Sequence, residues 1–343
     1  MFDGPLADRL LSLQTMTFLK AWTAMVALFG GLMAPGELAL AQFSEDPPIE
    51  EDVIEGMDTA EAPNAGDAVE DEAVPSLTEL ASVNSAFQAP SGSSEFNEAK
   101  DSTHSPIWLN HYSILYGPSV RNPKSFQPSP KGGPDRERPV LVRNHLTLGY
   151  DFSETLLIAG TLPFTWIPVQ GHRLEVMDPY VRVGLDHILQ NDYLNYYVDL
   201  RVHFPVTRES RDQDMLAAFQ MFQILTLVPG SNSSLSLDLF GSARTNFFGK
   251  QGSGADLELY LAPQLNYQMT STVALTVLYE MGASHWFGEK PFVFHSDGTD
   301  LEPGLSWDVT PKFNLHPYLN IFPSGKVSWD STSVGLMMNW KML

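Results

Sequence analysis

The feature that most constrains this chain is an alternation of apolar and polar residues that starts at Pro106 and runs to the C-terminus. In the final stretch, Val334, Leu336, Met338 and Trp340 alternate with residues that are mostly small or polar. Successive side chains of a β-strand point to opposite faces, so a period of two marks a strand with one apolar and one polar face. The C-terminal two thirds of the chain are therefore predicted to be all-β.

Twelve segments show this pattern, and most of them are longer than the usual five or six residues of a soluble strand. Short turns and longer polar loops alternate between them. The sequence therefore predicts an antiparallel sheet of twelve strands, at about 107–116, 140–150, 154–166, 177–188, 194–204, 215–228, 234–248, 255–268, 272–286, 299–309, 313–322 and 328–343.

Alternation alone does not say which face points inward, because a soluble barrel or sandwich would bury the apolar side. Three features favour a membrane barrel, whose apolar side faces lipid. The strands have the length that crosses a bilayer when tilted, and an even number of strands joined by short turns at one end and long loops at the other is typical of outer-membrane barrels. Aromatic residues also gather at both ends of the strands, as in the belts that mark lipid headgroups: Tyr116, Trp166, Phe204, Phe248, Trp286 and Trp329 at the loop end, and Trp108, Tyr150, Tyr193, Tyr267, Trp307 and Trp340 at the turn end.

With these features, residues 105–343 resemble the outer-membrane β-barrel proteins of Gram-negative bacteria, including porins. The segment His111-Tyr-Ser-Ile-Leu-Tyr-Gly-Pro and the later segment Arg143-Asn-His-Leu-Thr-Leu-Gly-Tyr-Asp-Phe-Ser are similar to uncharacterised barrel proteins of predatory bacteria. The resemblance implies insertion by the barrel assembly machinery, which reads the C-terminal strand. Such proteins usually end in an aromatic residue, whereas this chain ends in Leu343, so Trp340 and Met342 are expected to serve instead.

The N-terminal third has a different composition. Residues 1–41 carry an apolar run after Lys20 and a small-x-small site at Ala39-Leu40-Ala41, so they are predicted to be a signal peptide whose true start is possibly Met16, with cleavage before Gln42. Residues 42–104 hold sixteen acidic residues and one basic residue, which accounts for 15 of the 21 net negative charges. This segment is predicted to be a disordered acidic periplasmic extension.

Within that extension, residues 76–87 begin with a capping box and continue with helically spaced apolar residues. The interpretations left open are a transient helix in a linker and a short helix that docks on a periplasmic partner or enters a pore. The strong acidity of the chain excludes a nucleic-acid partner, which would need a basic surface. The absence of cysteine excludes disulfides, thiolate metal sites and cysteine nucleophiles.

Residues on the polar faces of the strands are predicted to line the lumen. Their mixed charge, with a small acidic excess, favours a passive channel for small solutes or ions that is mildly cation-selective. The nine histidines show no ligand spacing on one face, so no metal site or cofactor is expected. The predicted lining is Arg143, His145, Arg182, Asp186, Asp199, Arg201, His203, Asp238, Arg244, Asp256, Glu258, Glu280, Glu302, Asp308, His316 and Lys341.

Two other classes of function remain as alternatives to a channel. A lipase-type barrel would need a serine and a histidine as neighbours near the outer leaflet, oriented by a third polar group, and no serine motif accompanies His145. A protease-type barrel would need Asp/His pairs at the loop-side rim, where His285, His295, Asp297 and the pair Asp178/His203 are candidates. A surface adhesin would bind its partner through the loops or the acidic extension. We expect no enzyme.

The hairpin around Gln190-Asn191 allows a prediction of strand register. Pairing residues whose numbers sum to 381 places Arg182 opposite Asp199, whereas a sum of 383 places Arg182 opposite Arg201. Because like charges directly opposite one another destabilise a sheet, the sequence favours 381.

Overall fold

The computed structural model describes residues 106–129, 133, 135–136, 138–230, 233–249, 252–290, 292–323, 325 and 327–343. The predicted signal peptide, acidic extension and 76–87 segment lie outside these residues. The described part consists of antiparallel strands with one short helix, α3 (Arg208–Asp212). The strands are β1 (Ile107–Ser119), β2 (Leu141–Asp151), β3 (Leu156–Ile167), β4 (Arg173–Val176), β5 (Tyr180–Asn191), β6 (Leu194–His203), β7 (Met215–Leu227), β8 (Leu235–Phe248), β9 (Ala255–Gln268), β10 (Val273–Trp286), β11 (His295–Thr310), β12 (Phe313–Asn320) and β13 (Ser333–Lys341).

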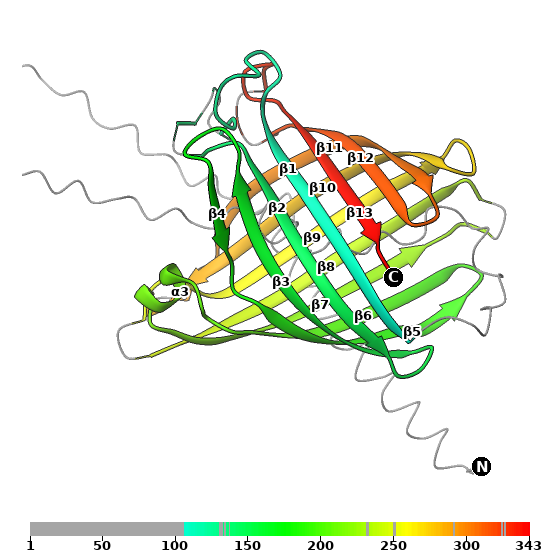
Figure 1. Ribbon diagram of the computed structural model, residues 1–343, viewed down its shortest axis with the longest axis horizontal. Coiled ribbons are helices and arrows are strands. Elements are labelled where there is room, and N and C mark those ends of the chain that lie inside the picture. The colour runs from blue at the N-terminus through cyan, green and yellow to red at the C-terminus, as the bar shows by residue number, and fades with distance from the viewer. Residues whose placement is uncertain are drawn as a thin grey trace, which may run out of the picture. The chain divides into compact units, whose positions relative to one another are not determined.

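The strands close into a barrel, as Figure 1 shows. Each strand pairs with the next along the chain, and β13 pairs with β1, so that the sheet has no free edge in the ring. The ring holds twelve strands, which confirms the predicted number. The thirteenth strand, β4, lies in the predicted loop 167–176. It pairs only with the last residues of β3, while the earlier part of β3 pairs with β5.

The two predicted strand boundaries that differ most from the structure are the starts of β11 and β13. β11 begins at His295 rather than near 299, because a polar extension continues past a bulge in its pairing with β10. β13 begins at Ser333 rather than 328, because Ser328 and Ser331 bond to each other in a turn that ends just before the strand. Neither end carries the apolar alternation that marks the parts of a strand that face lipid.

The apolar faces of the strands point outward. In β5, Val181 and Val183 are 42% and 39% exposed, whereas Arg182 between them is 4% exposed. Large hydrophobic residues are exposed in this way around the ring, while arginine, glutamate and asparagine side chains are buried on the opposite face. A soluble protein would have the reverse arrangement, so the outer surface is built to face lipid. Among the described residues, no helix has the length and apolar character needed to cross a membrane.

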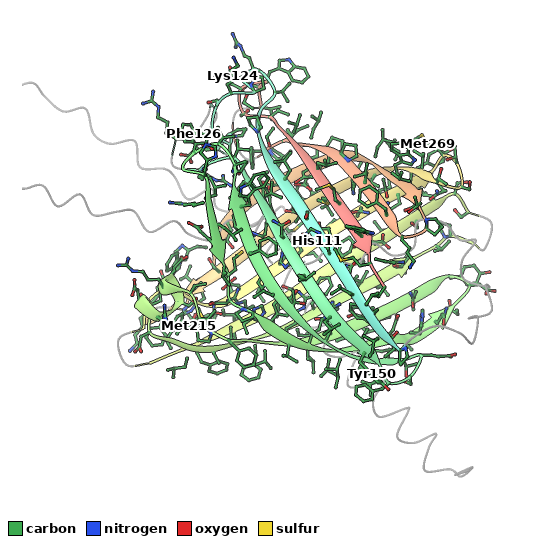
Figure 2. All side chains as sticks on the ribbon, viewed as in Figure 1. His111, Lys124, Phe126, Tyr150, Met215 and Met269 are labelled. Atoms are coloured by element: carbon green, nitrogen blue, oxygen red, sulfur yellow. The ribbon has the colours of Figure 1, made fainter. Side chains whose placement is uncertain are left out.

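The two ends of the barrel differ in the length of their connections. Figure 2 shows Lys124, Phe126 and Met215 at the end with long loops, and Tyr150 and Met269 at the end with short turns. Most of the predicted belt residues are exposed, including Trp166 and Trp329 near the loops.

Two predicted belt residues point into the barrel instead. Tyr116 is buried in an interior cluster with Tyr112 and Tyr318. Trp108 donates its indole N–H to Asp151 and lies under the guanidinium of Arg182. Both residues share a face of β1 with Tyr112, so their inward direction follows from the same alternation that carries the other belt residues outward.

The register prediction for the β5–β6 hairpin is wrong. The structure pairs Arg182 with Arg201 and Gly184 with Asp199, a sum of 383, and shifts by two more residues beyond a bulge near the turn. The repulsion argument failed because it considered only directly opposite residues. Asp199 lies two residues from Arg201 on the same face of β6 and bonds to both arginines, so the like-charged pair shares one counter-ion.

Candidate functional site: the interior of the barrel

Most of the residues predicted to line the lumen lie on the buried, inward face. Eleven of the sixteen are less than 9% exposed. Asp186, Arg244, Asp256 and Asp308 are partly exposed, and Lys341 is exposed at the end of β13. That all sixteen border a water-filled pore stays a prediction. The buried residues are Arg143, His145, Arg182, Asp199, Arg201, His203, Asp238, Glu258, Glu280, Glu302 and His316.

One sector of the interior is basic and centres on Asp199 and two arginines. Arg201 makes two hydrogen bonds to Asp199, from Nε to Oδ1 at 2.6 Å and from Nη2 to Oδ2 at 2.8 Å. Arg182 approaches the same carboxylate at 3.5 Å, and the phenyl ring of Phe222 lies 4.6 Å from the Arg201 guanidinium. Bidentate geometry and the aromatic face stabilise a guanidinium away from water. This cluster is a brace across β5, β6 and β7.

The basic sector continues onto β2. The guanidinium of Arg143 lies 5.6 Å from the ring centre of Tyr116, and His145 lies next to Tyr112 with ring centres 6.0 Å apart. Neither ring nitrogen of His145 has a hydrogen-bond partner in the described part of the chain. His145 therefore adds a buried ring without hydrogen-bond partners to a wall whose positive charges belong to the arginines.

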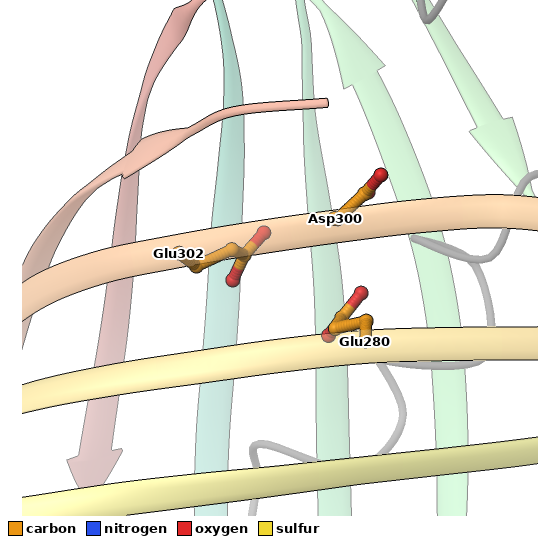
Figure 3. A group of neighbouring side chains, drawn as sticks. All are labelled: Glu280, Asp300 and Glu302. Atoms are coloured by element: carbon orange, nitrogen blue, oxygen red, sulfur yellow. The ribbon is translucent and has the colours of Figure 1, made fainter. Parts of the chain in front are cut away.

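A second sector is acidic and lies on β10 and β11. Glu280, Asp300 and Glu302 each have a carboxylate oxygen within 4.8 Å of the others, and all three are buried (Figure 3). Tyr260 donates to Glu280 at 2.8 Å, and the amide of Asn320 donates to Glu302 at 3.2 Å. Sequence reasoning named Glu280 and Glu302 but missed Asp300, although Asp300 shares the parity of Glu302 and lies within the predicted strand.

The two sectors face each other across the barrel. Five strands lie between β5 and β11 in either direction around the ring of twelve, so the two form opposite walls. Charge in the interior is thus divided between a basic wall, where Asp199 balances the arginines in part, and an acidic wall, where the three carboxylates lie together. A count of charges along the sequence does not reveal this separation.

The rim candidates for a protease-type site form pairs other than the predicted ones. His285 bonds to Asp256 at 2.5 Å and stacks on Phe292, while His295 bonds to Glu289. Asp297 accepts a hydrogen bond from Ser284. These contacts join neighbouring strands and loops at the rim.

The predicted pair Asp178/His203 does not form. Asp178 accepts hydrogen bonds from the backbone N–H groups of Val206 and Thr207 and from Ser210, and so holds the loop that leads into α3. His203 lies opposite Tyr180 and bonds to Gln220 instead. The prediction is wrong because it assumed the 381 register, which the structure does not have.

The outer face carries a polar cluster that sequence reasoning overlooked. Tyr112 packs in the interior, so its neighbours His111 and Ser113 on β1 project outward, where Asn144 of β2 lies directly opposite Ser113. His111 Nε2 is 3.1 Å from both Ser113 Oγ and Asn144 Oδ1, and Ser113 donates to Asn144 at 2.6 Å. Figure 2 shows His111 about midway along β1. A His-x-Ser spacing on one strand is the signal that would have found this cluster.

No family model matches the chain, and no curated protein matches its sequence. Among solved structures, it is similar to a KdgM porin in complex with disordered oligogalacturonate, with a TM-score of 0.39, 8% identity, and coverage of 69% of this chain and 99% of that one. It is also similar to the NanC porin, with a TM-score of 0.39, 9% identity, and coverage of 70% and 100%. TM-scores this low carry no argument, so the class of the protein is inferred from the apolar outer face and the polar inner face of its barrel.

Those faces define the class. A closed antiparallel barrel of twelve strands, apolar outside and polar within, with long loops at one end and short turns at the other, is a transmembrane β-barrel of the outer-membrane type.

Proposed function

We propose that the protein is a passive, porin-like channel for small solutes or ions in the outer membrane of a Gram-negative bacterium. The protein reaches this membrane by export through the periplasm. The observation that carries the proposal is the inward face, where charged side chains from opposite walls are held within a closed apolar shell. A polar interior in a closed barrel offers ions and small polar solutes a route that the lipid does not.

The channel is mildly cation-selective. Asp199 offsets part of the charge of the arginine wall, because it bonds to both Arg182 and Arg201. The acidic wall instead gathers Glu280, Asp300 and Glu302, so its negative field extends into the interior with less compensation. At physiological salt the Debye length is about 8 Å, which makes the charges nearest the path decisive.

Reversal potentials in a salt gradient across planar bilayers test this function. The wild-type barrel should show a small conductance and a reversal potential of the sign expected for cations. The double variant Glu280→Gln/Glu302→Gln should lose most of the cation preference, whereas the control Glu154→Gln, in an exposed turn, should keep it. Clear anion selectivity would refute the argument from the acidic wall, and absence of conductance would favour a plugged barrel.

The outer-face cluster supports a second candidate, a hydrolase acting on lipid esters. Ser113, His111 and Asn144 are the residue types of a serine hydrolase with an asparagine as orienting group. Ser113 Oγ would attack the ester carbonyl and pass its proton to His111, which would return it to the leaving alcohol, and water would then release the acyl group. Asn144 contacts Nε2 here rather than Nδ1, so the histidine ring would have to turn to complete the relay, and Ser113, which is 2% exposed, would have to be uncovered for an ester to reach it.

Release of fatty acid from phospholipid vesicles distinguishes the two candidates. A hydrolase should lose this release in Ser113→Ala and His111→Ala and keep it in Ser306→Ala, a buried serine on β11. If the wild-type barrel releases no fatty acid, the outer-face cluster is a structural contact, and the channel is the one remaining candidate function of the two.

A further inference from the structure

Strand pairing brings the three carboxylates of the acidic wall together on one inward face. Glu280 on β10 lies directly opposite Asp300 on β11, and Glu302 follows two residues later on the same face. Figure 3 shows the side chains of Glu280 and Glu302 directed toward each other. The exposed fractions of Glu280, Asp300 and Glu302 are 0%, 4% and 3%. Like charges opposite one another destabilise a sheet, and burial increases the cost.

Several oxygens at this place have no hydrogen-bond partner in the described part of the chain. They include Oε2 of Glu280 and Oε2 of Glu302, as well as two atoms from outside the cluster, the hydroxyl of Tyr112 and Oδ1 of Asn320. Asn320 is held at the site by its amide nitrogen, which contacts Asp300 at 3.5 Å and Glu302 at 3.2 Å. Tyr112, on β1, interacts electrostatically with both glutamates. Both residues are less than 5% exposed.

The residues that the structure describes supply little positive charge to this cluster. Arg138, at the base of the loop between β1 and β2, acts electrostatically on Asp300. The side chains that act on Glu280 are Asp300 and Tyr260, and those that act on Glu302 are Glu280 and Asp300. Buried oxygens without donors, arranged around three carboxylates, are satisfied together by one ion of opposite charge.

We propose that Glu280, Asp300 and Glu302 form a binding site for a divalent cation, with the Tyr112 hydroxyl as a further oxygen ligand and Asn320 as another once its amide turns to present Oδ1 in place of Nδ2. The donor set contains only oxygen, which favours Ca²⁺ or Mg²⁺ over softer metals. Ca²⁺ fits better, because it accepts six to eight oxygens at about 2.3–2.6 Å in irregular geometry, and ligand oxygens spread over as much as 4.8 Å can be bridged by an ion of that reach. The bound ion would join β10, β11, β12 and β1. The site is independent of whether the barrel conducts.

Terbium luminescence tests the site in the full barrel in detergent. Tb³⁺ replaces Ca²⁺ at oxygen sites, and Tyr260, whose hydroxyl is 2.8 Å from Glu280 Oε1, is placed to transfer excitation to it. The wild type should give tyrosine-sensitised luminescence that Ca²⁺ removes by competition. Glu280→Gln and Glu302→Gln should each weaken Ca²⁺ binding by about 10–100-fold.

The control is Asp238→Asn, which removes a buried inward carboxylate that already accepts hydrogen bonds from Thr226 and Asn266. It should leave Ca²⁺ binding unchanged. A gel that compares heated with unheated protein verifies that each variant is folded. The proposal is overturned if the wild type binds no ion, which would mean that shared protons neutralise the cluster, or if Asp238→Asn weakens binding as much as Glu302→Gln does. Because no current is measured, a failure here leaves the proposal of a conducting channel untouched, although a cluster neutralised by protons would remove the basis for its cation selectivity.

Discussion

Asp199 is the residue on which the basic wall depends, because its carboxylate is the counter-ion of two buried guanidiniums. It is 0% exposed and bonds to Arg201 twice and to Arg182 once. Its position also explains how two arginines can face each other across β5 and β6. At this scale the structure shows that ion pairs between residues i and i+2 on one face compete with pairs across the strands.

Replacement of Asp199 by asparagine should therefore destabilise the barrel strongly. The variant leaves two buried guanidiniums without their carboxylate, and breaking a buried pair in this way costs about 3–5 kcal/mol. Urea unfolding in detergent, followed by the heat-sensitive gel shift, measures the change. Asp238→Asn serves as the comparison, since its partners are neutral hydrogen-bond donors. Equal losses in the two variants would contradict the assigned role of Asp199.

At the scale of the element, the β5–β6 hairpin gives a direct test of register. The chain has no cysteine, so any disulfide that forms must join the two cysteines introduced by mutation. Val183 lies opposite Leu200 on the outer face, whereas Val181 lies opposite Val202. Val183→Cys with Leu200→Cys should form a disulfide on mild oxidation, because directly opposite positions bring the Cβ atoms close enough. Val181→Cys with Leu200→Cys, the pair that a sum of 381 would join, should form it poorly, and the reverse result would restore the predicted register.

The outer face of the same element should be sensitive to charge. Leu200 is 55% exposed and lies within β6, so an arginine there would face the hydrocarbon. Leu200→Arg should destabilise folding into lipid vesicles by about 2–4 kcal/mol if the position is near the bilayer midplane. The matched control is Val206→Arg, in the loop after β6 and 45% exposed, which should cost much less. Similar costs at both positions would argue that the exposed apolar face does not meet lipid.

At the scale of the whole molecule, the loop between β1 and β2 is attached to the rim. Val120 donates its backbone N–H to Thr332, Arg121 pairs with Asp330 at 3.0 Å, and Val140 bonds to Gln170. Arg138 at the loop's base acts on Asp300 of the acidic wall. The loop therefore brings positive charge toward the interior from the loop end.

Removal of this loop should raise the cation conductance. Because β1 extends to Ser119, a short glycine-serine linker should replace residues 120–138 so that the strand pairing survives. Conductance and reversal potential in planar bilayers measure the result, and a single Arg138→Gln variant should reproduce part of it. An unchanged conductance would place the narrowest part of the path away from the loop.

The same loop should be cut by protease on intact cells, while residues 42–104 should be protected.

The sequence by itself determined the number of strands, their approximate limits and the face that meets lipid. Each of these depends on local alternation, strand length and connection length, which can be read from the sequence of each strand and its connections. The same alternation placed Arg182, Asp199 and Glu302 on the inward face before any pairing was known. Where alternation stops, as at the ends of β11 and β13 outside the apolar band, the boundaries were mistaken.

Only the tertiary structure decided which inward residues meet. Register, bulges and barrel closure are properties of pairs of strands, and a shift of two residues preserves every face while it changes every partner. That is why the sum of 381 and the pair Asp178/His203 were wrong although the faces were right. Closure also brings β1 toward β11 across β13 and β12, so that Tyr112 comes within electrostatic reach of Glu280 and Glu302, residues about 170 to 190 positions away in the chain. No local pattern encodes that meeting, because it depends on the ring being complete.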